Sequence, residues 1–439
     1  MSKQKKLAAL RSKVNSTYQS HVSGAGTPRE WTRVSTGVFA LDYAYGINST
    51  GVAGPAVGVV HGLVAWESNG KTTAALKMIA AWQRHCARCY RPANNVREAQ
   101  VLNDNGTPFL DSDGNPQWML EGECDCYAAG VWAGPKEPDY KGKVSEKKEQ
   151  KEAFEAILEA LKANSFEPMV CVYVDQENAL DLIWGKKQGV FIRCIEHVVP
   201  GYAEQTIDIV DEYIRSGAVD LLVIDSLAAM VPMTEIEESS EDWQRGLQAR
   251  LINKGVRKWV GSSAMVATQF NEPRPVTQIW IQQWRNTMNS FGGSKVMPGG
   301  NGQRFALATL MEFYISDREV EEVKQFAGLS KKDNVEATFS ARLNIQAKKN
   351  KTAPVRKTSF RMAFMDEDEM KAGDVFELEY VFKMAMTLGV VEKSGSKYKF
   401  RGKEFTSQSA VQSLMSRNAM VMEWTKREIF KRLYEEHGP

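Results

Sequence analysis

Two hydrophobic periods alternate along most of this chain, from about residue 34 to residue 361. Short apolar runs rich in β-branched residues, such as "MVCVYVD" and "VDLLVIDS", indicate strands. Between them lie longer segments with apolar residues at helical spacing, such as "KTTAALKMIAAWQRH". Strands that alternate with helices are typical of parallel sheets. The pattern therefore predicts an α/β core, residues 35–365, with a mostly parallel sheet.

Three further segments flank or interrupt this core. Residues 1–34 begin with an amphipathic helix, "MSKQKKLAALRSK", and continue as a link. Residues 366–439 begin in the acidic turn "MDEDEM" and predict a small helix-rich domain with a hairpin turning at Arg401-Gly402. About 80 residues, from 86 to 166, separate the first core helix from the strand "MVCVYVD". Turn dipeptides and a Lys/Glu-rich helix there predict an inserted subdomain.

Composition excludes several classes of protein. With 439 residues the chain has room for two or three domains, and its 56 basic residues nearly balance 54 acidic ones, so bulk charge predicts no polyanion partner. No apolar run reaches the roughly 18 residues of a membrane span, and the basic N-terminus lacks the apolar region of a secretory signal. We expect a cytoplasmic protein whose six cysteines are metal ligands or core thiols.

The stretch "AWESNGKTT", residues 65–73, ends as a phosphate-binding loop does. The pattern G-x-x-x-x-G-K-[ST] expects glycine where the chain has Ala65. In a strand–loop–helix unit, the backbone N–H groups of Ser68 to Thr72 would face phosphate, Lys71 would reach the β- and γ-phosphates, and Thr72 would ligate Mg²⁺. Taken alone, the loop could be an unrelated Gly-Lys-Thr before a helix. A positive φ at Ala65 would cost roughly 1 kcal/mol and place turnover, not binding, in doubt.

Carboxylates follow two of the predicted strands. Asp225 ends "VDLLVIDS", as a carboxylate that binds a Mg²⁺-bound water would. Asp175 and Glu177 follow "VCVYV", and both strand ends are expected at the edge of the sheet where the loop lies. Glu177 could orient or deprotonate an attacking water. Each acid alone would be interpreted as a strand-end cap, but the three in this order favour a nucleotide site.

A series of segments then resembles the RecA family of recombinases over nearly the whole chain. "AWESNGKTT" is similar to the family's "GPESSGKTT", "VDQENALDLIWGKKQGV" to "IDAEHALDPIYARKLGV", and "KKNKTAP" to "KNKIAAP". Further similar segments are "STGVFALDYAYG", "RSGAVDLLVIDSLAAMVPMTEIE", "GLQARLINKGVRK" and "LGVVEKSGSKYKFRGKEF". The resemblance implies a RecA-type ATPase core with a small α+β C-terminal domain.

The resemblance also implies roles for particular residues. Glu177 falls on the catalytic glutamate, Gln269 on the glutamine that senses the γ-phosphate and begins the second DNA-binding loop, and Lys349 and Lys351 on lysines that reach ATP on a neighbouring subunit. The last point implies a filament, with the N-terminal helix packed on the adjacent protomer. The implied nucleotide-binding set is Glu67, Ser68, Asn69, Gly70, Lys71, Thr72, Thr73, Asp181, Trp184 (stacked on adenine) and Asp225, with Mg²⁺ at Thr72 and Asp225.

Two segments are candidates for DNA contacts. Arg250, Arg257 and Lys258 share a helix face, which would usually be only solvated; the resemblance implies phosphate contacts at Arg250 and Arg257. The segment from Gln269 to Gly299-Gly300 is longer than the family's second loop and mixes basic with aromatic residues, as single-strand binding sites do. Its candidates are Arg274, Trp280, Trp284, Arg285, Lys295, Gly299 and Gly300. The alternative is that Ile279, Trp280 and Trp284 form an apolar cluster on a helix.

The insert carries two close pairs of cysteines. Cys86 and Cys89 form a C-x-x-C knuckle, and Cys124 and Cys126 form C-x-C after turn-rich sequence. Two such pairs are how tetrahedral thiolate Zn²⁺ sites are built, and His85 is a substitute ligand. Zn²⁺ would allow a core-poor insert to fold. The alternative is four unrelated thiols.

The sequence thus predicts an ATP-dependent DNA recombinase that forms filaments on single-stranded DNA, pairs them with homologous duplex and exchanges strands. The long second loop and the insert suggest a phage or mobile-element version. Two alternatives stay open. One is a RecA-fold motor or helicase ring, and the other is a nucleotide-gated DNA-binding scaffold that hardly hydrolyses ATP.

Overall fold

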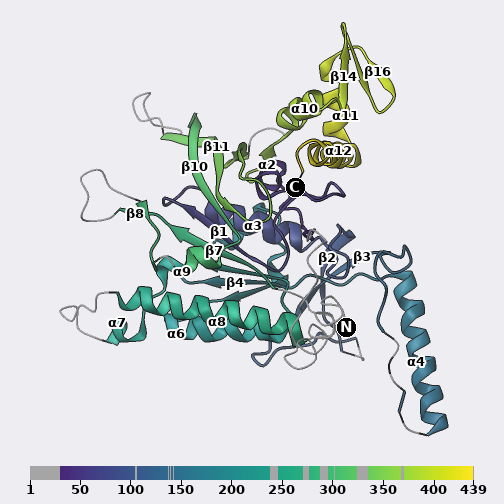
Figure 1. Cartoon of the computed structure of the whole chain (residues 1–439), viewed down its shortest axis with the longest axis vertical. Helices are drawn as coiled ribbons and strands as arrows, with labels where there is room; N and C mark the ends of the chain where they lie inside the picture. The colour runs from purple at the N-terminus through teal and green to yellow at the C-terminus, as the bar shows by residue number, and fades with distance from the viewer. Residues whose placement is uncertain are drawn as a thin grey trace, which may run out of the picture.

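A computed structural model describes residues 30–103, 106–136, 138, 140–141, 143–237, 246–269, 276–286, 295–300, 302–323, 335–366 and 370–438. Its centre is a nine-stranded sheet in the order β13-β12-β11-β10-β1-β7-β6-β4-β5 (Figure 1). From β10 to β5 neighbouring strands are parallel, and from β10 to β13 they are antiparallel. The predicted α/β fold with a mostly parallel sheet is confirmed.

The strands of this sheet vary widely in length. The parallel part consists of β1 (Val60–Ala65), β4 (Cys171–Asp175), β5 (Ile195–Val198), β6 (Leu221–Asp225) and β7 (Thr277–Gln283). The remaining strands are β10 (Thr309–Val323), β11 (Val335–Asn350), β12 (Lys357–Ala363) and β13 (Val375–Phe376). Every residue of β1, β4 and β6 is buried, which is why these segments are continuously apolar in sequence.

Each face of the sheet has its own apolar cluster. On one face, strand residues such as Leu63 and Tyr173 pack with α2 (Phe39–Tyr45) and α3 (Lys71–Trp82). On the other, α6 (Ala203–Ser216) and α8 (Leu247–Gln269) cover β4, β6 and β7. The two clusters hold β1 and its neighbours in a fixed layer, so the loops at their carboxyl ends start from rigid positions. Shorter helical segments are α5 (Leu182–Lys187), η1 (Ile192–Cys194), η2 (Leu227–Ala229), α7 (Met233–Glu237) and α9 (Gly302–Ala306).

The C-terminal segment has a separate small core. Its elements are α10 (Leu378–Thr387), β14 (Val391–Ser394), β15 (Lys397–Phe400), β16 (Lys403–Phe405), α11 (Gln408–Arg417) and α12 (Ala419–His437). This core also takes in Phe39 of α2, whose ring stacks on Phe430 at 4.5 Å between centroids. The expected hairpin turn is present at Arg401-Gly402, both with positive φ (50° and 73°).

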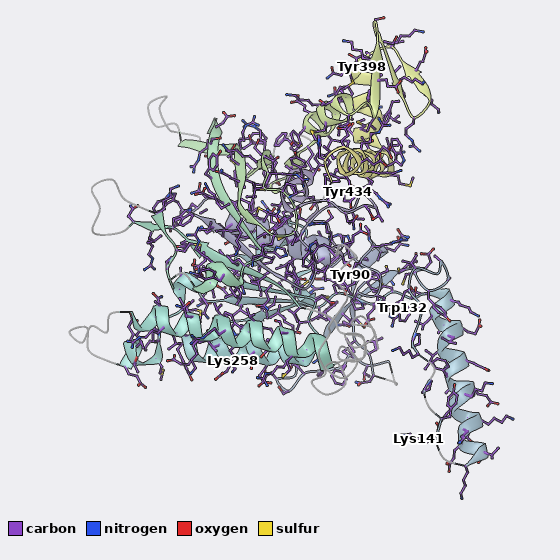
Figure 2. All side chains as sticks on the ribbon, viewed as in Figure 1. Tyr90, Trp132, Lys141, Lys258, Tyr398 and Tyr434 are labelled. Carbon is purple, nitrogen blue, oxygen red and sulfur yellow. The ribbon has the colours of Figure 1, made fainter. Side chains whose placement is uncertain are left out.

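The insert between α3 and β4 forms a hairpin and an arm. The hairpin is β2 (Asn94–Gln100) paired with β3 (Trp118–Glu123), and the arm is α4 (Val144–Ala163). The expected Lys/Glu-rich helix is therefore confirmed. None of the residues of α4 is buried, and the helix extends away from the rest of the molecule (Figure 1). Its side chains stand out on all sides (Figure 2).

Two expectations fall outside the described residues. They are the N-terminal helix, in residues 1–29, and Arg274. Among the helices that the structure does describe, none is both long and apolar enough to cross a membrane.

Candidate nucleotide and DNA site

The loop "AWESNGKTT" connects β1 to α3 in the strand–loop–helix order that its sequence predicts. Ser68 (φ 56°) and Gly70 (φ 82°) both adopt left-handed backbone conformations. A Cβ atom on Gly70 would lie 2.5 Å from Cδ2 of Leu343, a residue of β11. Both the backbone angle and this close approach require glycine at position 70. The loop is therefore held in shape by its own glycine and by β11.

Ala65, which departs from the phosphate-loop pattern, is the last residue of β1. Its side chain is fully buried in the core, and its backbone carbonyl accepts a hydrogen bond from the Trp284 amide at 2.9 Å. Ala65 is absent from the described residues with positive φ. The strain that a positive φ would cause is therefore not present, because this position has extended strand geometry that any residue adopts.

The two residues predicted to hold Mg²⁺ lie in direct contact. The Thr72 hydroxyl donates to Asp225 Oδ2 at 2.6 Å, and the buried Tyr173 hydroxyl donates to the same oxygen at 2.6 Å. Burial raises the pKa of Asp225, and these two hydrogen bonds partly oppose the shift. Hydroxyl and carboxylate oxygens are the hard ligands that Mg²⁺ prefers, so this pair fits that ion.

Lys71 directly precedes Thr72, the residue that contacts Asp225. Its ammonium donates to the Trp66 carbonyl at 2.8 Å, within the loop itself. Burial lowers its pKa, while the negative charges of Asp225, Glu177 and Glu67 act in the opposite direction. The side chain is thus a buried cation on whose charge three nearby carboxylates act.

Glu177 follows β4, and its carboxylate accepts hydrogen bonds from residues at the ends of two other strands. Its Oε1 accepts hydrogen bonds from the Ser226 hydroxyl at 2.7 Å, directly after β6, and from the Gln283 amide at 2.9 Å, at the end of β7. The neighbouring Asp175 has a different role, since its carboxylate accepts the backbone amides of Ala179 and Leu180 at 3.0–3.3 Å. Asp175 is a local cap, whereas Glu177 faces the edge of the sheet where the loop lies.

The predicted position of the sensing glutamine is wrong. Gln269 is the last residue of α8, which leads into the amino end of β7. At that end Gln278 pairs with Val60, the first residue of β1, whereas the phosphate loop follows the last. Gln269 therefore lies at the opposite edge of the sheet. Gln283, which the sequence reasoning missed, occupies the edge beside the loop, where it pairs with Ala65.

A cavity of about 360 Å³ lies beside the phosphate loop. Its lining residues are Ser68 to Thr73, Ile315, Arg318, Thr338, Ala341 and Phe364. The Trp184 indole donates to the Thr73 hydroxyl at 3.1 Å and lies nearly parallel to the Phe364 ring, 6.1 Å between centroids. Asp181 caps α5 by accepting the Trp184 amide at 2.9 Å. Phe364 was not predicted, because nothing in its sequence surroundings marks it.

Two other residues of the loop, Asn69 and Glu67, complete this region. Asn69 Oδ1 accepts the Ile315 backbone amide at 2.8 Å, so β10 also holds the loop. The Asn69 amide donates to the Glu67 carbonyl at 2.8 Å. The predicted nucleotide residues from Glu67 to Thr73, with Asp181, Trp184 and Asp225, are thus brought together at one edge of the sheet.

Lys349 and Lys351 lie far from the phosphate loop of their own chain. Lys349 is six residues beyond Leu343 on β11, or about 20 Å along the strand. The Lys349 ammonium donates to the Arg304 carbonyl, and that of Lys351 to the Phe305 carbonyl at 3.3 Å. The side chain of Phe305, whose carbonyl accepts from Lys351, is 79% exposed. The two lysines form a basic patch next to an exposed aromatic ring.

The expected long second loop is interrupted by β7. Trp280 lies in this central strand, 1% exposed, with its ring against Trp259. It cannot stack on a base, so that prediction is wrong. The alternative is correct in that Trp280 and Trp284 share an apolar cluster, but Ile279 belongs to the cluster on the other face of the sheet, and Trp280 lies on a strand instead of a helix. The loop proper begins only after Gln283 and is bounded by β8 (Arg285–Asn286) paired with β9 (Lys295–Val296).

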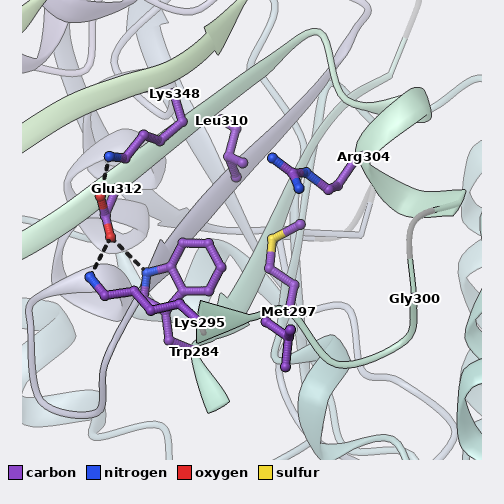
Figure 3. Close-up of a pocket in the computed structure, with 9 residues that line it drawn as sticks. Trp284, Lys295, Met297, Gly300, Arg304, Leu310, Glu312 and Lys348 are labelled. Carbon is purple, nitrogen blue, oxygen red and sulfur yellow. Dashed lines mark hydrogen bonds and ion pairs between the residues drawn. The ribbon is translucent and has the colours of Figure 1, made fainter. Parts of the chain in front are cut away.

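A buried carboxylate anchors both sides of this shorter loop. Glu312 accepts hydrogen bonds from the Trp284 indole at 2.9 Å and the Lys295 ammonium at 3.3 Å, and pairs with Lys348 at 2.9 Å (Figure 3). These cations lower the pKa of Glu312 against the opposing effect of burial. The four side chains line a cavity of about 470 Å³ together with Val296, Met297, Gly300, Arg304 and Leu310. Trp284 and Lys295 are therefore both hydrogen-bonded to Glu312, while Arg285 is exposed to solvent.

The glycine pair after β9 has a structural role. Gly299 (φ 87°) and Gly300 (φ 75°) both require left-handed backbone, and a Cβ atom on Gly299 would lie 2.9 Å from Ile252 of α8. These glycines let the turn pack against α8. The structure thus explains them without a phosphate, although Gly300 also lines the cavity beside Glu312.

The basic face of α8 differs from the expected one. Arg250 and Arg257 are exposed, and Lys254 between them is exposed as well. Lys258, labelled in Figure 2, pairs with Asp208 at 2.6 Å and with Asp211 at 3.3 Å. Two carboxylates thus neutralise Lys258, and Lys254 takes its place on the exposed stripe, at positions i, i+4 and i+7.

The four cysteines of the insert gather as predicted. Their sulfur atoms all lie within 4.8 Å of one another. His85 is not a member of this group, since its Nδ1 is directed to the Ala81 carbonyl oxygen, 2.7 Å away. The expectation that His85 substitutes as a ligand is wrong.

The fold and the loop place this chain in the class of α/β phosphate-loop proteins with a RecA-type core. A family model described as the RecA N-terminal domain matches residues 143–369, which is more than half of the chain. The match includes Glu177, Asp225 and Gln283; the phosphate loop lies before it, on the other side of the insert.

Curated proteins agree with this match. Protein RecA of Thermotoga sp. (strain RQ2) is 33% identical over 295 residues, covering 65% of this chain and 72% of the relative. Protein RecA of Syntrophus aciditrophicus is 34% identical over 252 residues, 57% of this chain and 64% of the relative, less than two thirds of its length. Protein RecA of Rhodospirillum centenum is 32% identical over 277 residues. The chain belongs to the RecA family.

Proposed function

We propose that this protein is an ATP-dependent DNA recombinase that forms filaments on single-stranded DNA and catalyses homologous pairing and strand exchange. The observation that carries the proposal is the bond between Gln283 and Glu177. Glu177 is the candidate catalytic carboxylate, and Gln283 directly precedes the basic loop that begins at Trp284. A ligand bound to that loop would therefore act on the carboxylate through a single residue.

The phosphate loop would bind the triphosphate of ATP. Lys71 and the backbone amides at the start of α3 supply positive charge at a helix N-terminus. Thr72 and Asp225 would hold Mg²⁺, which neutralises phosphate charge when bound. Trp184 and Phe364 present nearly parallel rings for a base. This arrangement supports ATP as the nucleotide.

Hydrolysis would depend on Glu177. Its carboxylate, held by Ser226 and Gln283, would accept a proton from the water that attacks the γ-phosphorus, as a general base does. A shift of Gln283 when DNA binds would therefore change the position of the Glu177 carboxylate, which is how we propose that DNA stimulates ATP hydrolysis.

A second copy of the chain would complete the nucleotide site. Lys349 and Lys351 are too distant to reach the loop of their own chain, and the exposed Phe305 beside them offers apolar surface for a neighbour. Basic groups that face a neighbour's triphosphate would couple ATP binding to assembly. This supports a helical filament with ATP between protomers.

DNA would bind at the exposed cations on the loop and on α8. Arg285, Arg250, Lys254 and Arg257 are exposed and would neutralise backbone phosphates. Because backbone contacts carry no sequence information, this surface suits a protein that binds any single strand.

Strand exchange between a single strand and homologous duplex, with and without ATP, tests the proposal. We expect joint molecules only with ATP, and filaments on single-stranded DNA in electron micrographs. Closed rings with unwinding activity would instead support a motor. ATP-dependent DNA binding without DNA-stimulated hydrolysis or exchange would support a scaffold. Either result would overturn the recombinase assignment.

A further inference from the structure

The sulfur atoms of the insert have the spacing of a metal tetrahedron. Cys89 Sγ and Cys124 Sγ are 3.7 Å apart, and all four sulfurs lie within 4.8 Å of one another. With Zn–S bonds of about 2.3 Å, the edge of a regular ZnS₄ tetrahedron is about 3.8 Å long. A disulfide bond needs about 2.05 Å between sulfurs, and all four cysteines are free. The geometry therefore fits four ligands around one ion.

The surroundings of the sulfurs suit thiolates. The guanidinium of Arg88 stays beside the cluster, because it donates to the Ser165 carbonyl at 3.0 Å and pairs with Glu167 at 2.8 Å. Cys86 and Cys126 are almost fully buried, where an uncompensated charge would be costly. A cation at the centre would supply the compensation.

The cluster of four cysteines brings together three segments of the chain at the base of the insert. Cys86 and Cys89 follow α3, and Cys124 and Cys126 follow β3. The third passage is Ser165, fully buried after α4, whose hydroxyl lies 3.2 Å from Cys126 Sγ and donates to the Cys124 carbonyl at 2.9 Å. The Ala87 amide donates to the Glu167 carbonyl at 2.8 Å, just before β4.

The insert has little else to hold it together. Among the residues of β2 and β3, only Leu120 is buried, and α4 buries none. A segment this poor in core depends on another source of folding free energy, and a structural metal is a common one.

We propose that Cys86, Cys89, Cys124 and Cys126 bind one Zn²⁺ as a closed structural site that fastens the insert to the ATPase core. All four ligands are protein thiolates, so the ion has no open position and takes no part in hydrolysis. The site joins the end of α3, whose other end carries the phosphate loop, to the start of β4, whose other end precedes Glu177. The ion would therefore hold together the end of α3 and the start of β4, which the insert separates in sequence.

Metal content of the full-length protein, purified without chelators or a histidine tag, tests this proposal. We expect about one zinc per chain, and strong visible bands of tetrahedral thiolate cobalt after exchange with Co²⁺. The double variant Cys89→Ser, Cys124→Ser should lose the metal, and Cys194→Ser, outside the cluster, should retain it. Well under one zinc per chain in wild-type protein supplied with Zn²⁺ during expression, or zinc retained in the double variant, would overturn the site.

A second measurement needs no variant and remains informative if the double variant does not fold. Alkylation of the native protein, mapped by mass spectrometry, should leave the four cluster cysteines unmodified until a chelator is added, whereas Cys171, buried in β4, stays unmodified throughout. Chelation should also expose the insert to limited proteolysis. Cluster cysteines that are labelled equally with and without chelator would contradict the proposal.

Discussion

The side chain of Gln283 reaches Glu177 across the end of an intervening strand. Gln283 ends β7, Glu177 follows β4, and β6 lies between them in the sheet, yet the amide and the carboxylate are 2.9 Å apart. Ser226, directly after β6, binds the same carboxylate oxygen. The ends of three adjacent strands thus meet at the Glu177 carboxylate.

Removal of the Gln283 amide tests whether this contact transmits the effect of DNA. We expect Gln283→Ala to lower DNA-stimulated ATPase by about tenfold or more, because Glu177 would no longer be positioned by the loop, while ATP affinity stays within about twofold. The measurement is steady-state ATPase with and without single-stranded DNA, with nucleotide binding measured in parallel. Gln269→Ala is the matched control and should behave as wild type. The reverse pattern would restore Gln269 as the sensing residue.

Replacement of the Glu177 carboxylate should stop hydrolysis without preventing ATP binding. We expect Glu177→Gln to lower the ATPase rate by about 10²–10⁴-fold, as loss of a general base does. Glu196→Gln, an exposed change on the neighbouring β5, controls for the lost charge. Equal ATPase activity in Glu177→Gln and wild type would remove Glu177 from the mechanism.

Ala65→Gly should not increase turnover. Because Ala65 is buried in an ordinary strand conformation, glycine there removes a packed methyl group and adds flexibility to the unfolded chain, at a cost of roughly 0.5–1 kcal/mol in stability. Thermal melting and ATPase assays together give the answer. A higher ATPase rate in the glycine variant would show that the alanine does restrain the loop.

Cations that are exposed and cations that are paired should differ in DNA binding. Arg285→Ala should weaken single-strand binding and reduce the slope of log K against log[salt] by about 0.7, the value for one lost phosphate contact. Lys258→Ala should change neither, since Asp208 and Asp211 already neutralise that ammonium. Salt titrations by fluorescence anisotropy distinguish the two variants. Unchanged binding by Arg285→Ala would exclude this residue from the interface.

Trp284 is expected to act through the shape of the loop. Trp284→Phe keeps an aromatic ring but loses the hydrogen bond to Glu312, so weaker single-strand binding by this variant would indicate that anchoring matters. Wild-type binding in Trp284→Phe but not in Trp284→Ala would instead indicate ring stacking.

Buried His61 predicts a loss of stability in mild acid. Burial lowers its pKa to about 4, below the unfolded value near 6.5, so its contribution is fully present above pH 6.5 and is lost as the pH falls toward 4. The difference between these two pKa values corresponds to about 3 kcal/mol in the free energy of unfolding. Urea unfolding at pH 7 and pH 4.5 should show a smaller acid effect in His61→Gln than in wild type or in His437→Gln, where the exposed histidine serves as control. An equal loss of stability between pH 7 and pH 4.5 in all three proteins would contradict this prediction.

The sequence predicted those parts of the site that depend on local order. The phosphate loop and the strands before Asp225 and Glu177 each have a local pattern, and their combination favoured a nucleotide site over an isolated loop or strand-end caps. The ends of parallel strands meet at one edge, so the acids could be assigned to the loop without coordinates.

Contacts between distant segments could not be predicted in this way. "TQIWIQQ" mixes glutamines with apolar residues, so its identity as a central strand, and with it the position of Gln283, became evident only from its pairing with β1 and β6. The anchoring of Trp284 by Glu312 joins residues 28 positions apart, and the Phe364 ring reaches Trp184 from another part of the chain. Neither contact has a periodic signature.

The arm α4 has a practical consequence for imaging. A helix of 20 residues is about 30 Å long, and this one stands free of the core. In micrographs of any assembly of this chain, each subunit would carry a rod that reveals how many copies are present and which way each one points.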